Sequence, residues 1–397
     1  MPEGPDPRGG GALARLVGTP ETFLRERFTR SPHHEPGADA DGFADLLSLD
    51  DVDELVTASG LRTPSFRLVR QGRTLPVNRV TRRARIGSRP VSDLIDVAAV
   101  HREFADGATI VLQGLHRSWP AVARLCRSLE DELTHPVQAN AYLTPPVAQG
   151  LNLHEDPHDV LVLQTHGTKR WVVHPGDGAG VWDLTLSSGD VLYLPAGTRH
   201  AAQTTEEASL HLTIGVRTTG WRDLVRRAVE DALDQADLEG GLPAGWAVRP
   251  RRLEDELASH LTRIGTTLTE KAEAWAATAA ADGARSFWEA RTPELAGGLL
   301  DLLEADELTD ATALRIRTPA AWRFGRRDGE LVLTADGHEL SMPESLEPAL
   351  EEMLAAGTFR PEQLDATIDR SSRLTLCRRL LREGLLAIDR APAGQGD

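Results

Sequence analysis

The stretch Gly189-Asp-Val-Leu-Tyr-Leu-Pro-Ala-Gly-Thr-Arg-His200 bears most directly on the fold, because it carries a histidine just behind a short apolar run. We predict a strand over Asp190–Leu194, which Pro195 and Gly197 bring to an end. The turn that follows places the histidine at the rim of the structure to which the strand belongs. A second histidine stands upstream, in the sequence His154-Glu155-Asp156.

Short β-rich runs fill the region around this stretch, from 137 to 216, and Gly, Pro and Asp turns separate them. Strands of this length and spacing are typical of a sandwich or jelly roll rather than of alternating strands and helices. The predicted strands are Ala139–Leu143, Val160–Thr165, Arg170–His174, Trp182–Leu186, Asp190–Leu194, His200–Thr204 and Ser209–Val216.

Two histidines and one carboxylate are the ligands of a facial triad for Fe(II), which leaves three positions of an octahedron open. His154 and Asp156 are two residues apart, so at a strand end both side chains point to the same side. His200 comes from a later strand and completes the set from across the barrel. We predict that these three residues bind iron. Their side chains need polar neighbours. The candidates for that role are Asn140, Thr204 and His211.

An iron centre of this kind needs an electron source to reduce O2. A keto acid supplies the electrons when it chelates the metal through its 2-oxo group and C1 carboxylate, and its distal carboxylate then needs a fixed cation nearby. Lys169 follows the turn His166-Gly-Thr168 and begins a predicted strand, so we assign this role to it. Tyr142 lies on the strand before His154, where its hydroxyl can donate to the same carboxylate.

Each of these residues also has an ordinary explanation when it is taken alone. An H-x-D pair is common in surface loops, a single lysine is usually solvated, and a tyrosine is often a core aromatic with a wet tip. Their joint placement in one β-rich block favours the functional interpretation. The sequence assigns no role to His158, and Asp159 either orients substrate or caps a strand. We expect Trp171 and Trp182 to be core residues.

The composition limits the class of partner. The chain has 397 residues, of which 40% are hydrophobic and 26% charged, as in a soluble globular protein of two or three domains. The formal net charge of -16 predicts no membrane partner and no direct binding of nucleic acid. That prediction holds only on average, because a local basic patch is compatible with an acidic chain.

The cysteines and the first residues indicate the compartment. Cys126 and Cys377 are far apart and have no metal-binding spacing, so we expect neither a disulfide framework nor a zinc–thiolate site and place the protein in the cytoplasm. Met1–Gly11 is rich in Pro and Gly and does not have the pattern of a signal peptide. No run approaches the roughly 18 apolar residues of a membrane span.

The chain changes character outside the β-rich block. Helical periodicity marks Trp221–Ala236 and Leu253–Ala281, and short strands followed by helices and a closing strand, Leu385–Ile388, are typical of a winged helix. We therefore predict four regions: a disordered tail over 1–18, a catalytic domain over 19–220, a helical region over 221–310 and a winged helix over 311–390.

Three blocks of this sequence closely resemble the JmjC-type cupins of the ribosomal oxygenase group. They are Asn140–Trp171, which contains the H-x-D pair and Lys169, then Gly189–His200, and finally Ser209-Leu-His-Leu-Thr213, which matches the strand that closes the barrel. The resemblance implies an α+β architecture. A double-stranded β-helix, also called a cupin or jelly roll, would be followed by a helical dimerisation region and a C-terminal winged helix.

The same resemblance implies an activity and a set of site residues. It implies a dioxygenase dependent on Fe(II) and 2-oxoglutarate that hydroxylates a protein side chain, with a ribosomal protein as a candidate substrate, and that forms a homodimer. By position, His154, Asp156 and His200 would bind the metal. Lys169 and Tyr142 would bind the distal carboxylate of 2-oxoglutarate, and Asn140 would line the same pocket.

Departures from the family pattern keep other functions open. Glu155 stands where the family often has an aromatic residue, and Pro157-His158 is also unusual. Both touch the substrate side. A hydroxylase of a small molecule or biosynthetic peptide, a demethylase, and a non-catalytic metal-binding cupin therefore remain alternatives. For the winged helix, the alternation of acidic and basic helices favours a protein-binding or structural role over nucleic-acid binding.

Overall fold

The structure, a computed structural model, describes residues 11–146, 148, 152–176, 178, 180–236, 238, 240–335, 337–364 and 366–390. Residues 1–10 of the predicted tail lie outside this part of the chain. The chain divides into two compact units, Met1–Thr218 and Thr219–Asp397. The first unit thus ends two residues before the boundary that the sequence predicts at 220.

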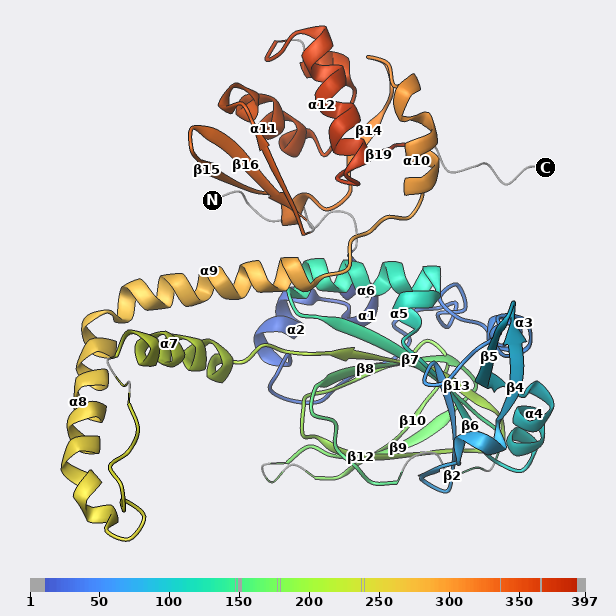
Figure 1. Ribbon diagram of the computed structural model, residues 1–397. Helices are drawn as coiled ribbons and strands as arrows, with labels where there is room; N and C mark the ends of the chain where they lie inside the picture. Colours follow the sequence, from blue (N-terminus) through green and yellow to red (C-terminus); the bar gives the residue numbers. More distant parts are fainter. Residues whose placement is uncertain are drawn as a thin grey trace. The chain divides into compact units, whose positions relative to one another are not determined.

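Two antiparallel sheets form the centre of the first unit (Figure 1). The larger sheet contains, in spatial order, β1 (His33–Glu35), β11 (Val191–Leu194), β8 (Asp159–His166), β13 (Ser209–Val216), β7 (Val137–Thr144), β6 (Thr109–Gln113), β2 (Phe66–Arg70) and β3 (Arg73–Thr74). The smaller sheet contains β10 (Trp182–Leu186), β9 (Lys169–His174) and β12 (Arg199–Thr204). These strands confirm the predicted double-stranded β-helix to within two residues at each end.

Strand β8 shows how the sequence builds this core. Its residues from Asp159 to Thr165 are all buried, so both of its faces are covered. Val160 and Val162 face the smaller sheet, where they pack in one cluster with Trp171. Leu161 and Leu163 point the other way, into a larger cluster beneath the helices. A continuous apolar run therefore suits this strand, because alternate side chains enter two different cores.

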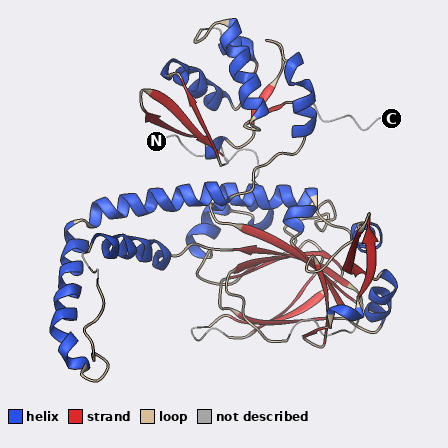
Figure 2. Ribbon diagram, viewed as in Figure 1, coloured by secondary structure: helices blue, strands red, loops and turns tan. Residues whose placement is uncertain are grey.

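Helices cover the outer face of the larger sheet, as Figure 2 shows. The helices of the first unit are α1 (Ala12–Val17), α2 (Pro20–Glu26), α3 (Leu49–Ala58), α4 (Val97–Ala105), α5 (Leu115–Ser118) and α6 (Pro120–Leu133). Helix α6 buries Val122, Leu125 and Leu129, which recur at helical spacing on one face.

The prediction of a disordered tail is wrong for Ala12–Val17, which forms helix α1. Leu13, Leu16 and Val17 are each at most 3% exposed and join the same core as α6. The sequence prediction extended the Pro- and Gly-rich segment over a short apolar motif. The helix is too short to be stable alone, and the burial of this motif stabilises it.

Strands β4 (Thr81–Ile86) and β5 (Arg89–Ile95) form a hairpin that the sequence did not predict. The pattern of alternating polar and apolar residues is absent, because arginines occupy three of the six positions of β4. The hairpin is a separate two-stranded sheet, held to the residues before β2 by the backbone hydrogen bonds from Thr63 to Asp93 and from Ile95 to Leu61.

In the described residues of the second unit, six α-helices combine with two small sheets. The helices are α7 (Trp221–Gln235), α8 (Glu254–Glu270), α9 (Ala272–Ala290), α10 (Gly298–Glu304), α11 (Glu347–Ala356) and α12 (Arg370–Arg382). The sheets, in spatial order, are β18 (Thr358–Phe359), β14 (Leu314–Ile316) and β19 (Leu386–Ile388), and β15 (Arg323–Arg327), β16 (Glu330–Ala335) and β17 (His338–Met342). The single predicted helix Leu253–Ala281 is in fact two, because the backbone at Lys271 leaves helical angles. Among the described residues, no helix is long and apolar enough to cross a membrane.

Candidate metal centre

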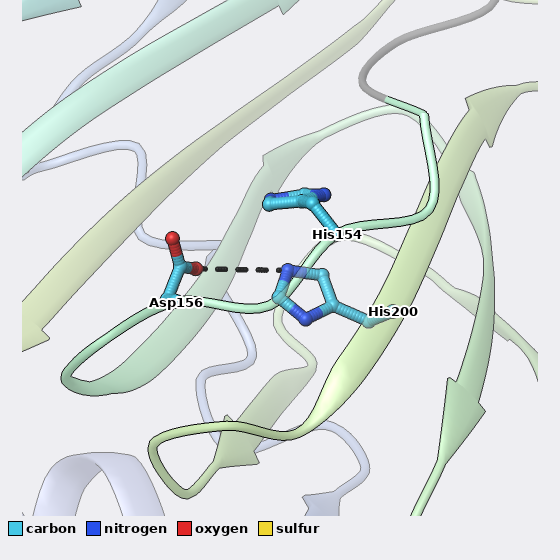
Figure 3. A group of neighbouring side chains, drawn as sticks. All are labelled: His154, Asp156 and His200. Atoms are coloured by element: carbon cyan, nitrogen blue, oxygen red, sulfur yellow. Dashed lines mark ion pairs between the residues drawn. The ribbon is translucent and has the colours of Figure 1, made fainter.

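His154, Asp156 and His200 come together as the sequence predicts. One donor atom from each lies within 4.8 Å of the other two, and the three side chains point toward one another (Figure 3). The His200 Nε2 atom is 3.7 Å from the Asp156 carboxylate. This is a set of nitrogen and oxygen donors around one point, which is the arrangement that a single divalent metal ion requires.

A pair of backbone hydrogen bonds holds the two histidines side by side. The His154 N–H donates to the His200 carbonyl at 3.0 Å, and the His200 N–H donates to the His154 carbonyl at 2.8 Å. The two residues thus form an isolated antiparallel bridge between the segment before β8 and strand β12. In such a pair the side chains emerge on the same face, so the bridge itself brings the two rings to a centroid separation of 4.3 Å.

The tautomers of both histidines fit a metal. The Nδ1 atom of His154 is 2.8 Å from the Asn152 carbonyl, and the Nδ1 atom of His200 is 2.9 Å from the Thr198 carbonyl. A carbonyl oxygen only accepts, so each Nδ1 carries the proton and each Nε2 keeps a free lone pair. Burial lowers the pKa of His200, which also favours its neutral, ligating form.

Asp159 anchors the loop that leads to His200. Its carboxylate is buried and accepts hydrogen bonds from the Tyr193 hydroxyl and from the backbone N–H of Ala196. The Gly197 N–H donates to the Asp156 carbonyl at 2.8 Å in the same loop. Asp159 therefore ties the start of β8 to the backbone of the loop before His200, and its side chain does not line the cavity described below.

A cavity of about 240 Å³ opens beside the three ligands. One row of residues across the larger sheet lines it: Arg67 is paired with Val111, Val111 with Tyr142, and Tyr142 with His211. Since paired residues of neighbouring strands share a face, all four side chains face the cavity. The Tyr142 and His211 rings stack with their centroids 4.9 Å apart. Burial raises the pKa of the Tyr142 hydroxyl, and the positive charge of Arg67 opposes part of that rise.

Lys169 closes the inner end of this cavity. Its side chain is 2% exposed and donates to the Thr144 hydroxyl at 3.1 Å. Among the described residues, no carboxylate pairs with its ammonium group, and burial lowers the pKa of Lys169 to about 7. Burial, with a smaller contribution from Lys169, also lowers the pKa of His211, which is therefore neutral. A buried cation without a counter-ion is a site for an anionic ligand.

Two of the three predicted polar neighbours have other partners. The Asn140 amide oxygen accepts from the Gly114 N–H, so its side chain lines the cavity with one end already bonded. The Thr204 hydroxyl bonds the backbone of Pro145 and Ala148 and does not line the cavity. His211 does line the cavity, beside Tyr142.

Sequence reasoning did not single out several residues of this cavity. Arg67 lies on a strand far upstream of the H-x-D pair, and no local pattern links the two. Trp171 is a core residue, as predicted, and it also lines the cavity with its ring 5.8 Å from that of His200. His158 lines the cavity and lies 3.2 Å from the Gln138 amide. Lys169 and Trp171 are two residues apart on β9, so their side chains lie on the same face of the strand. That spacing could have predicted that Trp171 lines the cavity.

We expect Asp159→Asn to weaken Co(II) binding by about ten- to a hundredfold, as for other groups that orient metal ligands. The amide replaces one acceptor oxygen with a donor, so the side chain at 159 can no longer accept both the Tyr193 hydroxyl and the Ala196 N–H. A titration followed by the visible absorption of Co(II) measures the effect. Asp183→Asn, which changes an exposed carboxylate on β10, is the matched control. Equal affinities in the two variants would contradict a positioning role for Asp159.

Comparison with known proteins places this site in a known domain. A profile of the JmjC domain matches residues 115–179 and 174–224, a region that contains the three candidate ligands and Lys169. Among curated relatives, the bifunctional lysine-specific demethylase and histidyl-hydroxylase NO66 of Drosophila mojavensis is 27% identical over 251 residues, and that of Branchiostoma floridae is 35% identical over 141 residues. These matches cover 57% and 35% of this chain but only 27% and 23% of the relatives.

The fold has a similar counterpart among solved structures. The Escherichia coli protein YcfD superposes with a TM-score of 0.53 at 17% identity, over 94% of this chain and 99% of its own. A structure of YcfD described as a ribosomal oxygenase in complex with cobalt and succinic acid gives a TM-score of 0.52. At this identity the likeness concerns the fold. Together with the sequence matches, it shows that this chain carries a JmjC domain within residues 115–224, similar in sequence to that of the NO66 proteins and in fold to YcfD.

Proposed function

We propose that this protein is an Fe(II)- and 2-oxoglutarate-dependent dioxygenase that hydroxylates a side chain of a protein or peptide. The observation that carries the proposal is the meeting of two features in one cavity. A facial set of two histidines and a carboxylate lies at one end, and a buried lysine without a carboxylate partner among the described residues lies at the other.

The residues have separate tasks in this proposal. His154, Asp156 and His200 hold the iron, and their Nδ1–H bonds and the bridge keep them in place. Lys169 binds the distal carboxylate of 2-oxoglutarate. Tyr142, which lies beside Arg67, donates to the same group, and Asn140 shapes the pocket next to it. When bound, the iron and the keto acid supply the O2 activation that places an oxygen atom in a C–H bond of the substrate.

Lys169 is unusual within this chain, which supports the role. The chain has 44 basic residues, and Lys169 is one of only two lysines among them. An arginine is bulkier and always charged, whereas a lysine presents a compact charge that tolerates burial by losing its proton. Lys169 is enclosed and, among the described residues, has no carboxylate partner, so its compact charge is available to a small anionic ligand.

The proposal of a protein substrate rests on the relatives. NO66 proteins carry the name histidyl-hydroxylase and YcfD that of ribosomal oxygenase, so a ribosomal protein is the first substrate that we propose to test. The NO66 name also includes lysine-specific demethylase, and the same iron chemistry would serve it. A small molecule or biosynthetic peptide would enter the same cavity.

We further propose that the helical part of the second unit mediates a homodimer and that the last part is a winged helix. Apolar residues on α7 and α8 stay exposed within the chain, including Val225, Leu257 and Leu261, and a second copy would cover them. The last part has the sheets and helices of a small α+β domain around its own core. Cys126 and Cys377 are buried and unpaired, which suits a cytoplasmic location.

The activity is tested by succinate formation from 2-oxoglutarate in air, with added Fe(II) and a candidate ribosomal protein. We expect iron-dependent turnover and a mass increase of the substrate by one oxygen atom. His154→Ala should reduce both to background, because two ligands remain and the backbone bridge alone does not bind iron. His166→Ala changes an exposed histidine of the same barrel and should leave turnover unchanged. Turnover that survives in His154→Ala would contradict the proposed ligand set.

The pKa of Lys169 predicts how 2-oxoglutarate binding depends on pH. The ammonium that binds the distal carboxylate is present below a pH of about 7 and is lost above it. The dissociation constant should therefore rise above that pH, by up to about tenfold per pH unit. Calorimetry on the Mn(II)-loaded protein between neutral and alkaline pH measures it. Lys169→Met should bind weakly at every pH, without this slope.

The direction of the change separates Lys169 from the metal ligands. Deprotonation of the histidine ligands favours metal binding, so their titration would tighten the complex as the pH rises. A dissociation constant that falls or stays flat in the wild type over this range would contradict the assignment of Lys169.

A further inference from the structure

The arginines of this chain are concentrated in one short interval. Nine of them lie between Gly60 and Ser92, and all 60 aspartates and glutamates of the chain lie outside it. In a chain with a net charge of -16, this interval has the opposite charge from its surroundings. The average charge therefore describes this part of the surface poorly.

The hairpin β4–β5 carries four of these nine arginines, and we call it the arginine arm. Its four arginines, Arg82, Arg83, Arg85 and Arg89, are all exposed. Two exposed arginines next to the hairpin have acidic partners, since Arg62 pairs with Asp93 and Arg79 with Glu103. Within the described part of the chain, none of the four arm residues has a carboxylate at ion-pair distance. The arm thus presents four uncompensated cations to an external partner.

The arm is attached to β2, a strand that lines the cavity of the iron site. Backbone hydrogen bonds join it to the residues directly before β2, and β2 places Arg67 in the cavity. The turn after β2 packs against the segment that leads to His154: a Cβ atom at Gly72 would lie 2.3 Å from the Asn152 amide nitrogen. Asn152 in turn holds His154 through its carbonyl. A ligand on the arm and a substrate in the cavity would therefore be neighbours.

The chemistry of the arm favours phosphate groups over an acidic polypeptide. Protein interfaces depend on aromatic or other large apolar anchors in their centre. The arm has no aromatic residue between Thr81 and Ile95. Guanidinium groups alone suffice for the phosphodiester backbone, which they bind in bidentate fashion, and they also stack on unpaired bases.

We propose that the arginine arm binds RNA next to the iron site, so that the enzyme recognises a protein side chain presented beside RNA. The choice of RNA over DNA rests on the proposed function, because a ribosomal protein substrate lies against RNA phosphates. The arm supplies salt-dependent affinity for the RNA, and the cavity selects the protein side chain.

Binding of a fluorescein-labelled RNA stem-loop to the full-length protein tests the proposal, without iron or 2-oxoglutarate. The triple variant Arg82→Glu, Arg83→Glu, Arg85→Glu should bind at least about tenfold more weakly at moderate salt, and the slope of log affinity against log salt should fall by about two or more. The matched control is Arg25→Glu, Arg27→Glu, Arg30→Glu. It makes the same charge change at exposed residues in and after α2, away from the arm (Figure 1), and should bind as the wild type does.

Three results would overturn the proposal. They are equal RNA binding by the two triple variants, equal or tighter binding of a DNA hairpin of the same sequence, and displacement of the RNA by poly-glutamate at equal charge concentration. Substrate-free succinate formation, which the arm does not touch, should be unchanged in the arm variant and shows that it is folded. Absence of succinate in every variant would contradict the proposed function and would leave the RNA measurement standing on its own.

Discussion

The site depends on the exchange of two backbone hydrogen bonds between His154 and His200. These residues are far apart in sequence, and each lies at the edge of a turn where side-chain positions vary most easily. The bridge removes that freedom, because a hydrogen-bonded antiparallel pair has one geometry and presents both side chains on one face. The Nδ1–H bonds to Asn152 and Thr198 then set ring rotation and tautomer. Asp156 needs only the two-residue period of an extended chain to join them.

The second constraint is electrostatic and lies at the opposite end of the same cavity. An ammonium group enclosed by the barrel is costly unless an anion accompanies it, and the lowered pKa of Lys169 expresses that cost. The protein keeps the position for a ligand rather than satisfying it with a carboxylate of its own. Thr144, Tyr142 and neutral His211 surround the cation with polar groups that do not compete with an anion.

Much of this site was predictable from sequence, for a physical reason. His200 and Lys169 lie in short strands, and His154 and Asp156 lie in the extended segment before β8, so a period of two assigns each side chain to a face. Turns with Gly and Pro mark where the strands end. Residues that act across long sequence separations left no such signal. Asp159 depends on a loop more than thirty residues away, and Arg67 reaches the cavity only because β2 adds to β6.

Helix α1 and the β4–β5 hairpin were not predicted, for a different reason. Helix α1 is stabilised by burial of Leu13, Leu16 and Val17 rather than by its own propensity, and it follows a segment whose composition indicates disorder. The β4–β5 hairpin has arginines where a half-buried strand would alternate polar and apolar residues, so periodicity did not reveal it. Its attachment to the residues before β2 depends on tertiary contacts, which no local pattern encodes. The same arginines that concealed the hairpin give it a surface unlike the rest of the chain.

Anaerobic titration of the Fe(II)-loaded protein with 2-oxoglutarate, followed by visible charge-transfer absorption, tests directly whether the two ends of the cavity serve one ligand. A keto acid that chelates iron through its 2-oxo group produces such a band, whereas a carboxylate bound elsewhere does not. We predict a saturable band at one keto acid per chain in the wild type. The band should vanish in His154→Ala and require much higher 2-oxoglutarate in Lys169→Met. A wild type without the band, or a His154→Ala variant that retains it, would contradict the assignment of this cavity as an iron and 2-oxoglutarate site.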